Sequence, residues 1–328
     1  MKGYRLTGSP ARRLEPADIP DPVAGPGEVV VSLRAASLNY RDLRLSEGTS
    51  GIVPLSDGAG TVAAAGSGVA GWRPGDRVVI GFMPGWAEGP FSAAKQATSL
   101  GGGTVDGVLA ERIAVPASAL VRLPDDVGFE EAAAYPCAGV TAWSALFERR
   151  PVQPGETVLL LGTGGVSVFA LQLAKLAGAR VVITSSSDAK LERARALGAD
   201  ETINYRETPD WAPAVVALTG GLGADLAVDV GGPGTLNATL KAVRHGGRIS
   251  LMGVLTGFEG PIDTALILQK RITLQGIYVG PVTSLDALVR AGVRPIIDRV
   301  FAFDEAEAAY ATMAAATHFG KLVIRIAD

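Results

Sequence analysis

Two hydrophobic patterns divide this chain. In roughly the first 120 residues, short apolar runs alternate with turns rich in Gly and Pro, as at residues 28–35 and at residues 78–82, which follow a turn at residues 73–76. Apolar runs of this length, bounded by turn residues and without a helical period, predict β-strands. The sequence therefore predicts a β-barrel-like lobe at the start of the chain.

The pattern changes after Pro124, where short buried strands begin to alternate with amphipathic helices. A strand at residues 157–161 precedes a helix at 166–176, and a strand at 181–184 precedes a helix at 188–197. This alternation is typical of a doubly wound parallel sheet. The sequence thus predicts an α/β fold, with further strands at residues 201–204, 226–230, 248–252 and 272–279 and, in the tail, a helix at 304–313 and a strand at 321–326.

Composition and charge exclude several classes of protein. Of the 328 residues, 48% are hydrophobic and 19% charged, so the chain can bury a large core and is not disordered. A net charge of -3 gives no basic surface for nucleic acid or an anionic membrane, and no apolar run approaches the ~20 residues of a membrane span. Because the N-terminus also lacks the apolar segment of a signal peptide, we expect a cytoplasmic protein with no nucleic-acid or membrane partner.

A glycine-rich turn connects the strand at 157–161 to the next helix and reads Gly-Thr-Gly-Gly-Val-Ser over residues 162–167. A dinucleotide needs glycine where the backbone turns sharply and approaches the pyrophosphate, and a helix N-terminus that faces the phosphates. Ser167 replaces the third glycine of the usual pattern, and a purely structural turn is the alternative interpretation. The candidate phosphate-binding residues are Gly162, Thr163, Gly164, Gly165 and Val166.

The end of the second strand of this region indicates which dinucleotide binds. An acidic residue there would bind the ribose 2′-hydroxyl of NAD, but the chain has Ser185 and Ser186. Small hydroxyl groups leave room for a 2′-phosphate, and Lys190 and Arg206 are placed to supply positive charge. We therefore expect NADPH as the cofactor; the alternative is that both cations are ordinary solvated side chains.

Seven segments, in order along the chain, share the pattern of one enzyme family. They are residues 37–42 (Ser-Leu-Asn-Tyr-Arg-Asp), 57–60 (Asp-Gly-Ala-Gly), 73–78 (Arg-Pro-Gly-Asp-Arg-Val), 137–143 (Cys-Ala-Gly-Val-Thr-Ala-Trp), 161–167, 197–200 (Leu-Gly-Ala-Asp) and 319–323 (Phe-Gly-Lys-Leu-Val). Together they resemble the medium-chain dehydrogenase/reductase superfamily, and within it the zinc-free branch of quinone oxidoreductases and enoyl reductases. The resemblance implies a GroES-like catalytic domain of residues 1–123 and 281–328, a Rossmann domain of residues 124–280 and a cleft between them.

The resemblance further implies cofactor contacts beyond the glycine turn, and a homodimer. The strand at 272–279 is apolar and late in the sheet order, so its free edge would pair with a second copy of the chain. The additional cofactor-binding candidates are Asn39, Thr141, Gly231, Gly253, Val254, Tyr278 and Val279.

Zinc-dependent members of the family hold a catalytic metal with two Cys and one His. Here the first position is Asn39, the histidine region reads Leu-Ser-Asp over residues 55–57, and only Cys137 matches. The structural zinc loop is missing too, because residues 85–108 contain no cysteine. We therefore expect no metal, a packed thiol at Cys137 and structural roles for the two histidines.

Without a metal, oxidation of an alcohol lacks the Lewis acid that stabilises an alkoxide. Reduction of a conjugated acceptor does not require a Lewis acid, because the negative charge moves to a distant oxygen that a hydrogen-bond donor can stabilise. The sequence therefore predicts a zinc-independent, NADPH-dependent oxidoreductase that transfers hydride to a small-molecule quinone, enone or enoyl acceptor. The candidate catalytic residues are Tyr40, as proton donor or orienting hydroxyl, Asn39 and Asp57.

Several alternatives stay open. Tyr40 can be a buried aromatic with a satisfied hydroxyl, and Arg41 and Asp42 can simply pair with each other or cap the following turn. For the whole protein, the alternatives are a zinc-type alcohol dehydrogenase-like enzyme and a non-catalytic NADPH-binding protein. Metal analysis separates the first of these, and acceptor-dependent NADPH oxidation separates the second.

Overall fold

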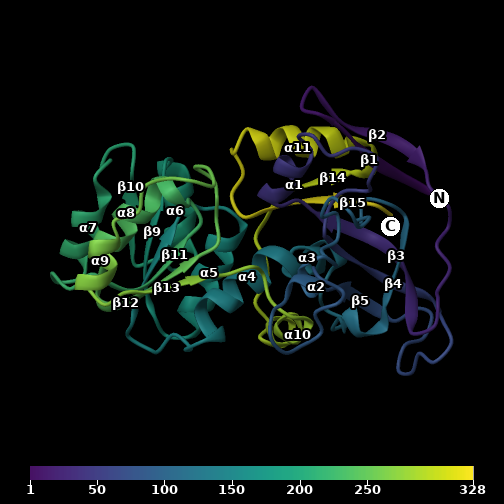
Figure 1. The fold of residues 1–328 in the computed structure, drawn as a ribbon, viewed down its shortest axis with the longest axis horizontal. Helices are drawn as coiled ribbons and strands as arrows, with labels where there is room; N and C mark the ends of the chain where they lie inside the picture. The colour runs from purple at the N-terminus through teal and green to yellow at the C-terminus, as the bar shows by residue number, and fades with distance from the viewer. Residues whose placement is uncertain (328) are drawn as a thin grey trace. The chain divides into compact units, whose positions relative to one another are not determined.

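Each of two units of the chain is built on one large β-sheet (Figure 1). The computed structural model describes residues 1–327. The first unit consists of Met1–Val140 and the residues from Val279 onward, and the second unit of Thr141–Tyr278. The predicted α/β fold, a β-rich lobe with a doubly wound parallel sheet, is confirmed; the domain boundaries given above stay a prediction.

The strand β3 (Glu28–Ser37) is central to the first unit. Its alternate residues Val29, Val31 and Leu33 are buried, because side chains on one face of a strand point into the core. The sheet around it runs in the order β14-β15-β3-β4-β5-β7, with β6 also paired to β3, and a separate sheet contains β1 and β2. The other strands are β1 (Lys2–Ser9), β2 (Arg12–Asp18), β4 (Asp57–Ala65), β5 (Arg77–Ile80), β6 (Arg112–Pro116), β7 (Leu120–Arg122), β14 (Ile297–Ala302) and β15 (Lys321–Arg325).

The helices of the first unit are short. Helix α3 (Phe129–Ala133) packs against β3 and β4, so this segment belongs with the first unit by its contacts. Helix α10 (Val282–Arg290) follows a pattern that the sequence analysis did not identify, with buried residues at 282, 285, 288 and 289. The remaining helical segments are α1 (Tyr40–Leu45), α2 (Ala93–Gln96), η1 (Ala117–Ala119), η2 (Tyr135–Gly139), η4 (Phe303–Glu305) and α11 (Ala306–Ala314).

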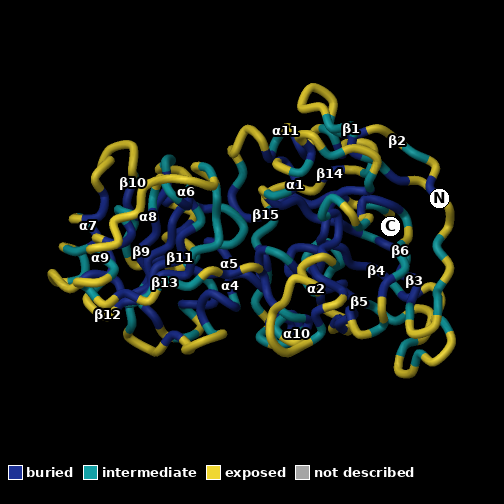
Figure 2. The backbone as a smooth tube through the Cα atoms, viewed as in Figure 1, coloured by how far each residue is buried: buried dark blue, intermediate teal, exposed yellow. Residues whose placement is uncertain are grey.

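The second unit contains a parallel sheet with the strand order β10-β9-β8-β11-β12-β13. Three inner strands of this sheet, β9, β8 and β11, are apolar and largely buried on both faces, which Figure 2 shows as dark blue segments between the helices. The strands are β8 (Thr157–Leu161), β9 (Arg180–Ser185), β10 (Glu201–Asn204), β11 (Ala224–Asp229), β12 (Val243–Leu251) and β13 (Thr273–Gly276). The helices are α4 (Val140–Trp143), η3 (Ser144–Glu148), α5 (Gly165–Leu176), α6 (Asp188–Ala196), α7 (Trp211–Leu218), α8 (Pro233–Ala242) and α9 (Thr264–Gln269).

The strand order reverses direction between β8 and β11. The chain proceeds outward from β8 through β9 to β10, then returns to β11 and continues outward through β12 to β13. Ligands of doubly wound sheets bind at the carboxyl ends of the strands beside such a reversal. The fold therefore points to the loops that follow β8 and β11.

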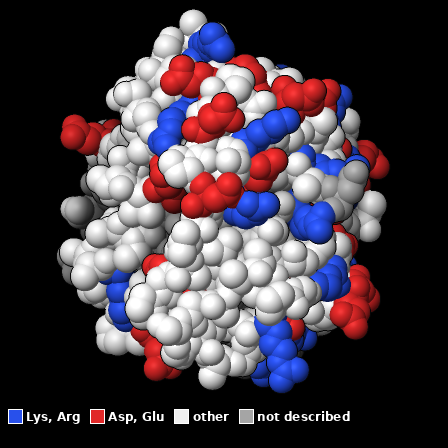
Figure 3. Space-filling view, turned by 90° about the vertical axis from the view of Figure 1, so that its right-hand side faces the viewer, with Lys and Arg blue, Asp and Glu red and all other residues white. Residues whose placement is uncertain are grey.

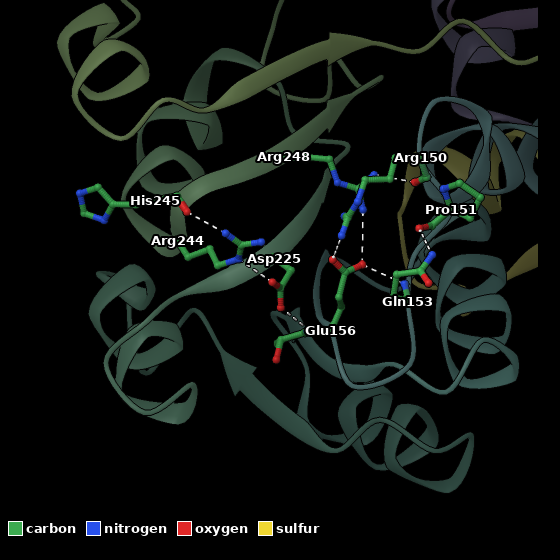
Figure 4. Close-up of polar contacts among 9 residues, drawn as sticks. Arg150, Pro151, Gln153, Glu156, Asp225, Arg244, His245 and Arg248 are labelled. Atoms are coloured by element: carbon green, nitrogen blue, oxygen red, sulfur yellow. Dashed lines mark hydrogen bonds and ion pairs between the residues drawn. The ribbon is translucent and has the colours of Figure 1, made fainter.

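A network of charged residues joins the opposite, amino ends of three strands (Figure 4). Glu156, just before β8, pairs with Arg150 and with Arg248 of β12. Asp225 of β11 pairs with Arg244 of β12 and accepts a hydrogen bond of 2.7 Å from the amide of the first β8 residue. Because this network lies at the amino ends, it fixes strand positions rather than lining a ligand site.

The distribution of charged side chains on the surface is consistent with the nearly balanced charge of the sequence. Figure 3 shows acidic and basic side chains interspersed on one face, together with a broad uncharged area. Over the described residues, the helices are all too short or too polar to cross a lipid bilayer.

Candidate functional site

The glycine turn after β8 has the conformation that a phosphate site needs. Gly162 has a φ of +74°, a left-handed backbone that favours glycine. Gly164 has an ordinary φ of -81°, and no protein atom lies within 4 Å of a Cβ added there. Nothing in the protein itself therefore requires glycine at position 164, and the open space beside the backbone fits a bound pyrophosphate at the N-terminus of α5.

Ser167 explains why the third glycine of the pattern is replaceable. This residue is 1% exposed, and its hydroxyl donates a hydrogen bond of 2.7 Å to the carbonyl oxygen of Leu161. The side chain thus joins the first turn of α5 to the end of β8. The close approach of helix and strand is kept without a glycine.

The predicted 2′-phosphate residues lie at the carboxyl ends of β9 and β10. Ser185 is 3% exposed, and its hydroxyl lies 3.4 Å from that of Thr163 in the glycine turn. Ser186 and Lys190 are half-buried, with Lys190 in the first turn of α6, and Arg206 is exposed. Ser186, Lys190 and Arg206 are therefore the members of the set that a ligand can reach most readily.

A buried carboxyl group that the sequence analysis did not single out organises the loop after β11. Asp229 is 0% exposed, and its Oδ1 accepts hydrogen bonds from the amides of Gly231 (2.9 Å) and Gly232 (3.0 Å). The same oxygen accepts from the hydroxyl of Thr235, and Oδ2 accepts from that of Thr239, each at 2.7 Å. Asp229 therefore fixes the position of Gly231, one of the predicted cofactor residues.

The loop after β12 packs directly on the loop after β11. A Cβ added to Gly253 would lie 1.6 Å from the carbonyl oxygen of Val230, so no other residue fits at position 253. The hydroxyl of Thr256 donates a hydrogen bond of 2.8 Å to the carbonyl oxygen of Gly231. The predicted residues Gly231, Gly253 and Val254 are thus brought together at the carboxyl edge of the sheet.

The remaining cofactor candidates lie where the chain passes from one unit to the other, at residues 141 and 278–279. Thr141 is 5% exposed and belongs to α4, whereas Tyr278 is exposed. Val279 has a φ of +55°, a left-handed conformation that is rare for a β-branched residue. The predicted strand at 272–279 is therefore too long, because β13 ends at Gly276 and the backbone of Val279 cannot continue it.

In the first unit, Asp57 lies at the centre of a buried polar cluster. This residue is 0% exposed, and its Oδ2 accepts a hydrogen bond of 3.0 Å from the amide of Cys137. Its Oδ1 accepts one of 2.6 Å from the hydroxyl of Ser56. The ammonium of Lys321, 3.9 Å from Oδ2, completes the surroundings of this carboxyl group.

Lys321 also contacts the segment before α1, although the sequence analysis assigned it no role. Its Nζ donates hydrogen bonds of 2.7 Å to the carbonyl oxygen of Leu38 and to Oδ1 of Asn39. Asn39 and Asp57, which are predicted catalytic residues, therefore share one buried cation.

The residues that follow Asn39 have different surroundings. Tyr40 is 36% exposed, so the alternative of a buried aromatic is wrong. Arg41 donates to the carbonyl oxygen of Leu100 and lies 3.7 Å from Asp42, whose other oxygen accepts from the amide of Asn39. The alternative that Arg41 pairs with Asp42 is thus confirmed, and the cap that Asp42 provides is at Asn39, the start of α1.

Asp42 should make stability depend on pH. Burial raises the pKa of its carboxyl from 3.8 to about 6, and the nearby Asp57 adds to this, while Arg41 and Lys321 oppose it. Since the folded state then binds the proton more tightly, the stabilising effect of that proton is present in full below pH ~4 and is lost as the pH rises past ~6. The change amounts to about 3 kcal/mol.

Asp42→Asn removes this titration but keeps an oxygen that can accept from the Asn39 amide. We expect the difference in unfolding free energy, variant minus wild type, to increase by about 2 kcal/mol between pH 4 and pH 7.5. Urea denaturation at both pH values measures it, with Asp18→Asn, at an exposed carboxyl, as the control. Equal differences at the two pH values would contradict the prediction.

The polar cluster does not fit a tetrahedral zinc site. Burial raises the pKa of the Cys137 thiol, which disfavours the thiolate that zinc needs. The amide oxygen of Asn39 already accepts from Lys321, whose positive charge would repel a second cation. Within residues 1–327, no group of three or more His, Cys, Asp or Glu side chains could hold a metal ion.

The two histidines lie outside this cluster and the carboxyl edge of the parallel sheet. His245 is exposed near the amino end of β12 (Figure 4), and His318 is half-buried before β15.

Comparisons with known proteins agree with this geometry. Residues 25–125 match the alcohol dehydrogenase GroES-like domain, and residues 165–293 match the zinc-binding dehydrogenase family. A zinc-type alcohol dehydrogenase-like protein of Schizosaccharomyces pombe is 41% identical over 338 aligned positions, which cover 98% of this chain and 97% of the relative.

Solved structures give the same result. A putative alcohol dehydrogenase from Sinorhizobium meliloti 1021 is 42% identical with a TM-score of 0.90, over 99% of this chain and 100% of that one. A structure described as an NAD-dependent alcohol dehydrogenase is 36% identical with a TM-score of 0.89, over the same shares of the two chains. The chain therefore belongs to the medium-chain dehydrogenase/reductase superfamily and is an oxidoreductase whose fold binds a nicotinamide cofactor.

Proposed function

We propose that the protein is a zinc-independent, NADPH-dependent oxidoreductase that reduces a conjugated carbonyl compound, either a quinone or an enone or enoyl compound. The observation that carries the proposal is the buried ammonium of Lys321, which donates to Asn39 and faces Asp57. In the resemblance described above, these two residues and Cys137 stand where zinc-dependent relatives hold their metal. A cation fixed in the protein supports chemistry that needs no metal ion.

Different residues of this chain bind the cofactor and stabilise the acceptor in the proposed reaction. Bound NADPH supplies a hydride. The backbone amides at the start of α5 bind the pyrophosphate, and Ser186, Lys190 and Arg206 bind the 2′-phosphate. The residues around Asn39 stabilise the negative charge that the acceptor oxygen gains, and Tyr40 or water returns a proton to the product.

A panel of acceptors tests this function. Purified protein is assayed for NADPH consumption with quinones, enones, enoyl thioesters and aldehydes, with and without a chelator, and its zinc content is measured. We expect reduction of a conjugated acceptor, unchanged by the chelator, and no stoichiometric zinc.

Two other results would identify a different function. The names of the relatives favour alcohol oxidation with a metal, which about one zinc per chain and loss of activity in chelator would support. If no acceptor increases NADPH consumption, the protein is a non-catalytic binder of the cofactor.

Lys190→Ala should reduce the preference for NADPH. A charge-assisted contact with phosphate contributes about 1.5–3 kcal/mol, so we expect NADPH binding to weaken by roughly tenfold or more and NADH binding to stay nearly the same. Fluorescence titration of both cofactors measures the two dissociation constants. Lys241→Ala, at an exposed lysine in the last turn of α8, is the control and should change neither. Equal losses for NADPH and NADH would show that Lys190 does not contact the 2′-phosphate.

We also propose a homodimer formed through the β13 edge of the parallel sheet. β13 is the last strand in the sheet order, and exposed apolar residues lie in the segment before it, among them Leu255 (49% exposed) and Leu268 (78% exposed). An open edge beside exposed apolar side chains favours pairing with a second copy. Light scattering should give twice the mass of the chain at micromolar concentration, and Leu268→Glu should shift the protein toward monomer. A wild-type monomer would contradict the proposal.

A further inference from the structure

The ammonium of Lys321 is deeply buried in the first unit. Lys321 is 2% exposed and begins β15, where Gly320 precedes it. Burial of an ammonium is costly unless hydrogen bonds compensate for the lost water. The carbonyl oxygen of Leu38 and Oδ1 of Asn39, both at 2.7 Å, provide that compensation, with Asp57 at 3.9 Å.

The contact with Lys321 fixes the orientation of the Asn39 carboxamide. An ammonium group has only donors, so the oxygen of the carboxamide must face it and the NH₂ group must point away. Asn39 is 9% exposed, and its Nδ2 is buried with no hydrogen-bond partner in the part of the chain that the structure describes. The molecule thus contains a polar donor that is held in place but not used.

An unused buried donor has an energetic cost and a chemical consequence. Leaving such a group without a partner destabilises the folded state, and an acceptor atom of a bound molecule would remove that penalty. The positive charge on Lys321 also polarises the amide through its oxygen, which makes the N–H a stronger donor. This donor suits an oxygen atom that gains negative charge.

We propose that Lys321 is a positioning residue that directs and polarises the Asn39 carboxamide, so that Nδ2–H donates to the carbonyl oxygen of the hydride acceptor. This inference rests on the proposed function. As NADPH delivers hydride to the β-carbon of the acceptor, the C=C electron pair shifts and the carbonyl oxygen becomes an enolate oxygen. Asn39 keeps its proton and stabilises that charge, NADPH becomes NADP⁺, and the proton that completes the product comes from Tyr40 or water.

Two substitutions separate this role from a structural one. Asn39→Asp keeps an oxygen for Lys321 but removes the NH₂ donor, and Lys321→Met removes the charge while keeping a similar length. Because a quinone becomes aromatic on reduction, its reduction depends less than that of an enone on a hydrogen bond that stabilises the negative charge on the acceptor oxygen. We therefore expect the ratio of enone turnover to quinone turnover at saturating NADPH to fall about 100-fold in Asn39→Asp and about tenfold or more in Lys321→Met.

The ratio is insensitive to loss of folded protein, because a smaller active fraction lowers both turnovers equally. Lys2→Met, at an exposed lysine of the same unit, is the control and should leave the ratio unchanged. In the double variant, the ratio should match that of Asn39→Asp alone, since Lys321 acts through Asn39. Unchanged ratios, or a loss confined to NADPH affinity, would overturn the proposal; the latter would assign the Asn39 donor to the cofactor.

A spectroscopic measurement tests the same contact without turnover. The side-chain amide ¹H–¹⁵N signals of Asn39, identified by their absence in Asn39→Asp, should shift when NADP⁺ and a saturated ketone are added together. NADP⁺ alone should cause a smaller shift, and Lys321→Met should reduce the response to the ketone. If the wild-type enzyme is active but its Asn39 signals do not shift when the ketone is added, this inference alone is disproved. If the wild-type protein is inactive with every acceptor, the proposed function is disproved as well.

Discussion

Replacement of Asp229 by alanine should lower the free energy of unfolding by about 3–5 kcal/mol, because four hydrogen bonds to a fully buried carboxyl group disappear together. The amides of Gly231 and Gly232 and the hydroxyls of Thr235 and Thr239 would lose their acceptor in a site that water reaches poorly. Urea denaturation monitored by circular dichroism measures the loss.

The same substitution should weaken cofactor binding, since the loop after β11 would no longer be fixed at the carboxyl edge of the sheet. Asp229→Asn is the matched control. Its Oδ1 can still accept from the two amides and Thr235, and its NH₂ can donate to the hydroxyl of Thr239, so we expect a loss of only about 1 kcal/mol. If Asp229→Ala is as stable as Asp229→Asn, the carboxyl group does not hold this loop.

Local signals predicted much of the parallel sheet. The strands at 157–161 and 201–204 have the predicted bounds, and helix α5 begins one residue earlier than expected. Buried apolar runs, glycine turns and helix starts are all encoded within a few neighbouring residues. The glycine turn and the elements around it could therefore be predicted from the sequence.

Other elements depend on a backbone conformation that the secondary-structure preference of the residue types does not reveal. Val279 is a good strand residue by type, yet its φ of +55° ends the predicted strand early. Helix α10 has buried residues at a helical spacing, but the sequence analysis identified no helix there. At Val279, the surrounding structure outweighs the local preference, whereas the local signal of α10 was present and was missed.

The polar cluster around Asp57 could be predicted only in part. Asn39 and Asp57 were found through the resemblance, but the contact between Asn39 and Lys321 joins residues 282 positions apart. Asp57 meets Cys137 across 80 positions. Contacts at such separations have no periodic signature, so a lysine in a final strand is indistinguishable from a surface lysine until the fold brings it inside.

Tyr40→Phe tests the last catalytic residue predicted from the sequence. The substitution removes only the hydroxyl from a side chain that is 36% exposed at the start of α1, so the fold should be unaffected. General acid assistance is worth about 10²–10⁴-fold in rate, and we expect the turnover of an enone to fall within this range while NADPH affinity is retained. Steady-state kinetics with the enone and fluorescence titration of NADPH measure the two quantities.

Tyr4→Phe, on β1 of the same unit, is the control for loss of a tyrosine hydroxyl and should leave turnover unchanged. The acceptor also matters, because the doubly reduced oxygens of a quinone take protons from water readily, whereas the carbon of an enolate needs a donor held close to it. The Tyr40→Phe effect should therefore be large for enones and small for quinones. A change of less than about threefold with every enone would mean that water is the proton donor and that Tyr40 only shapes the site.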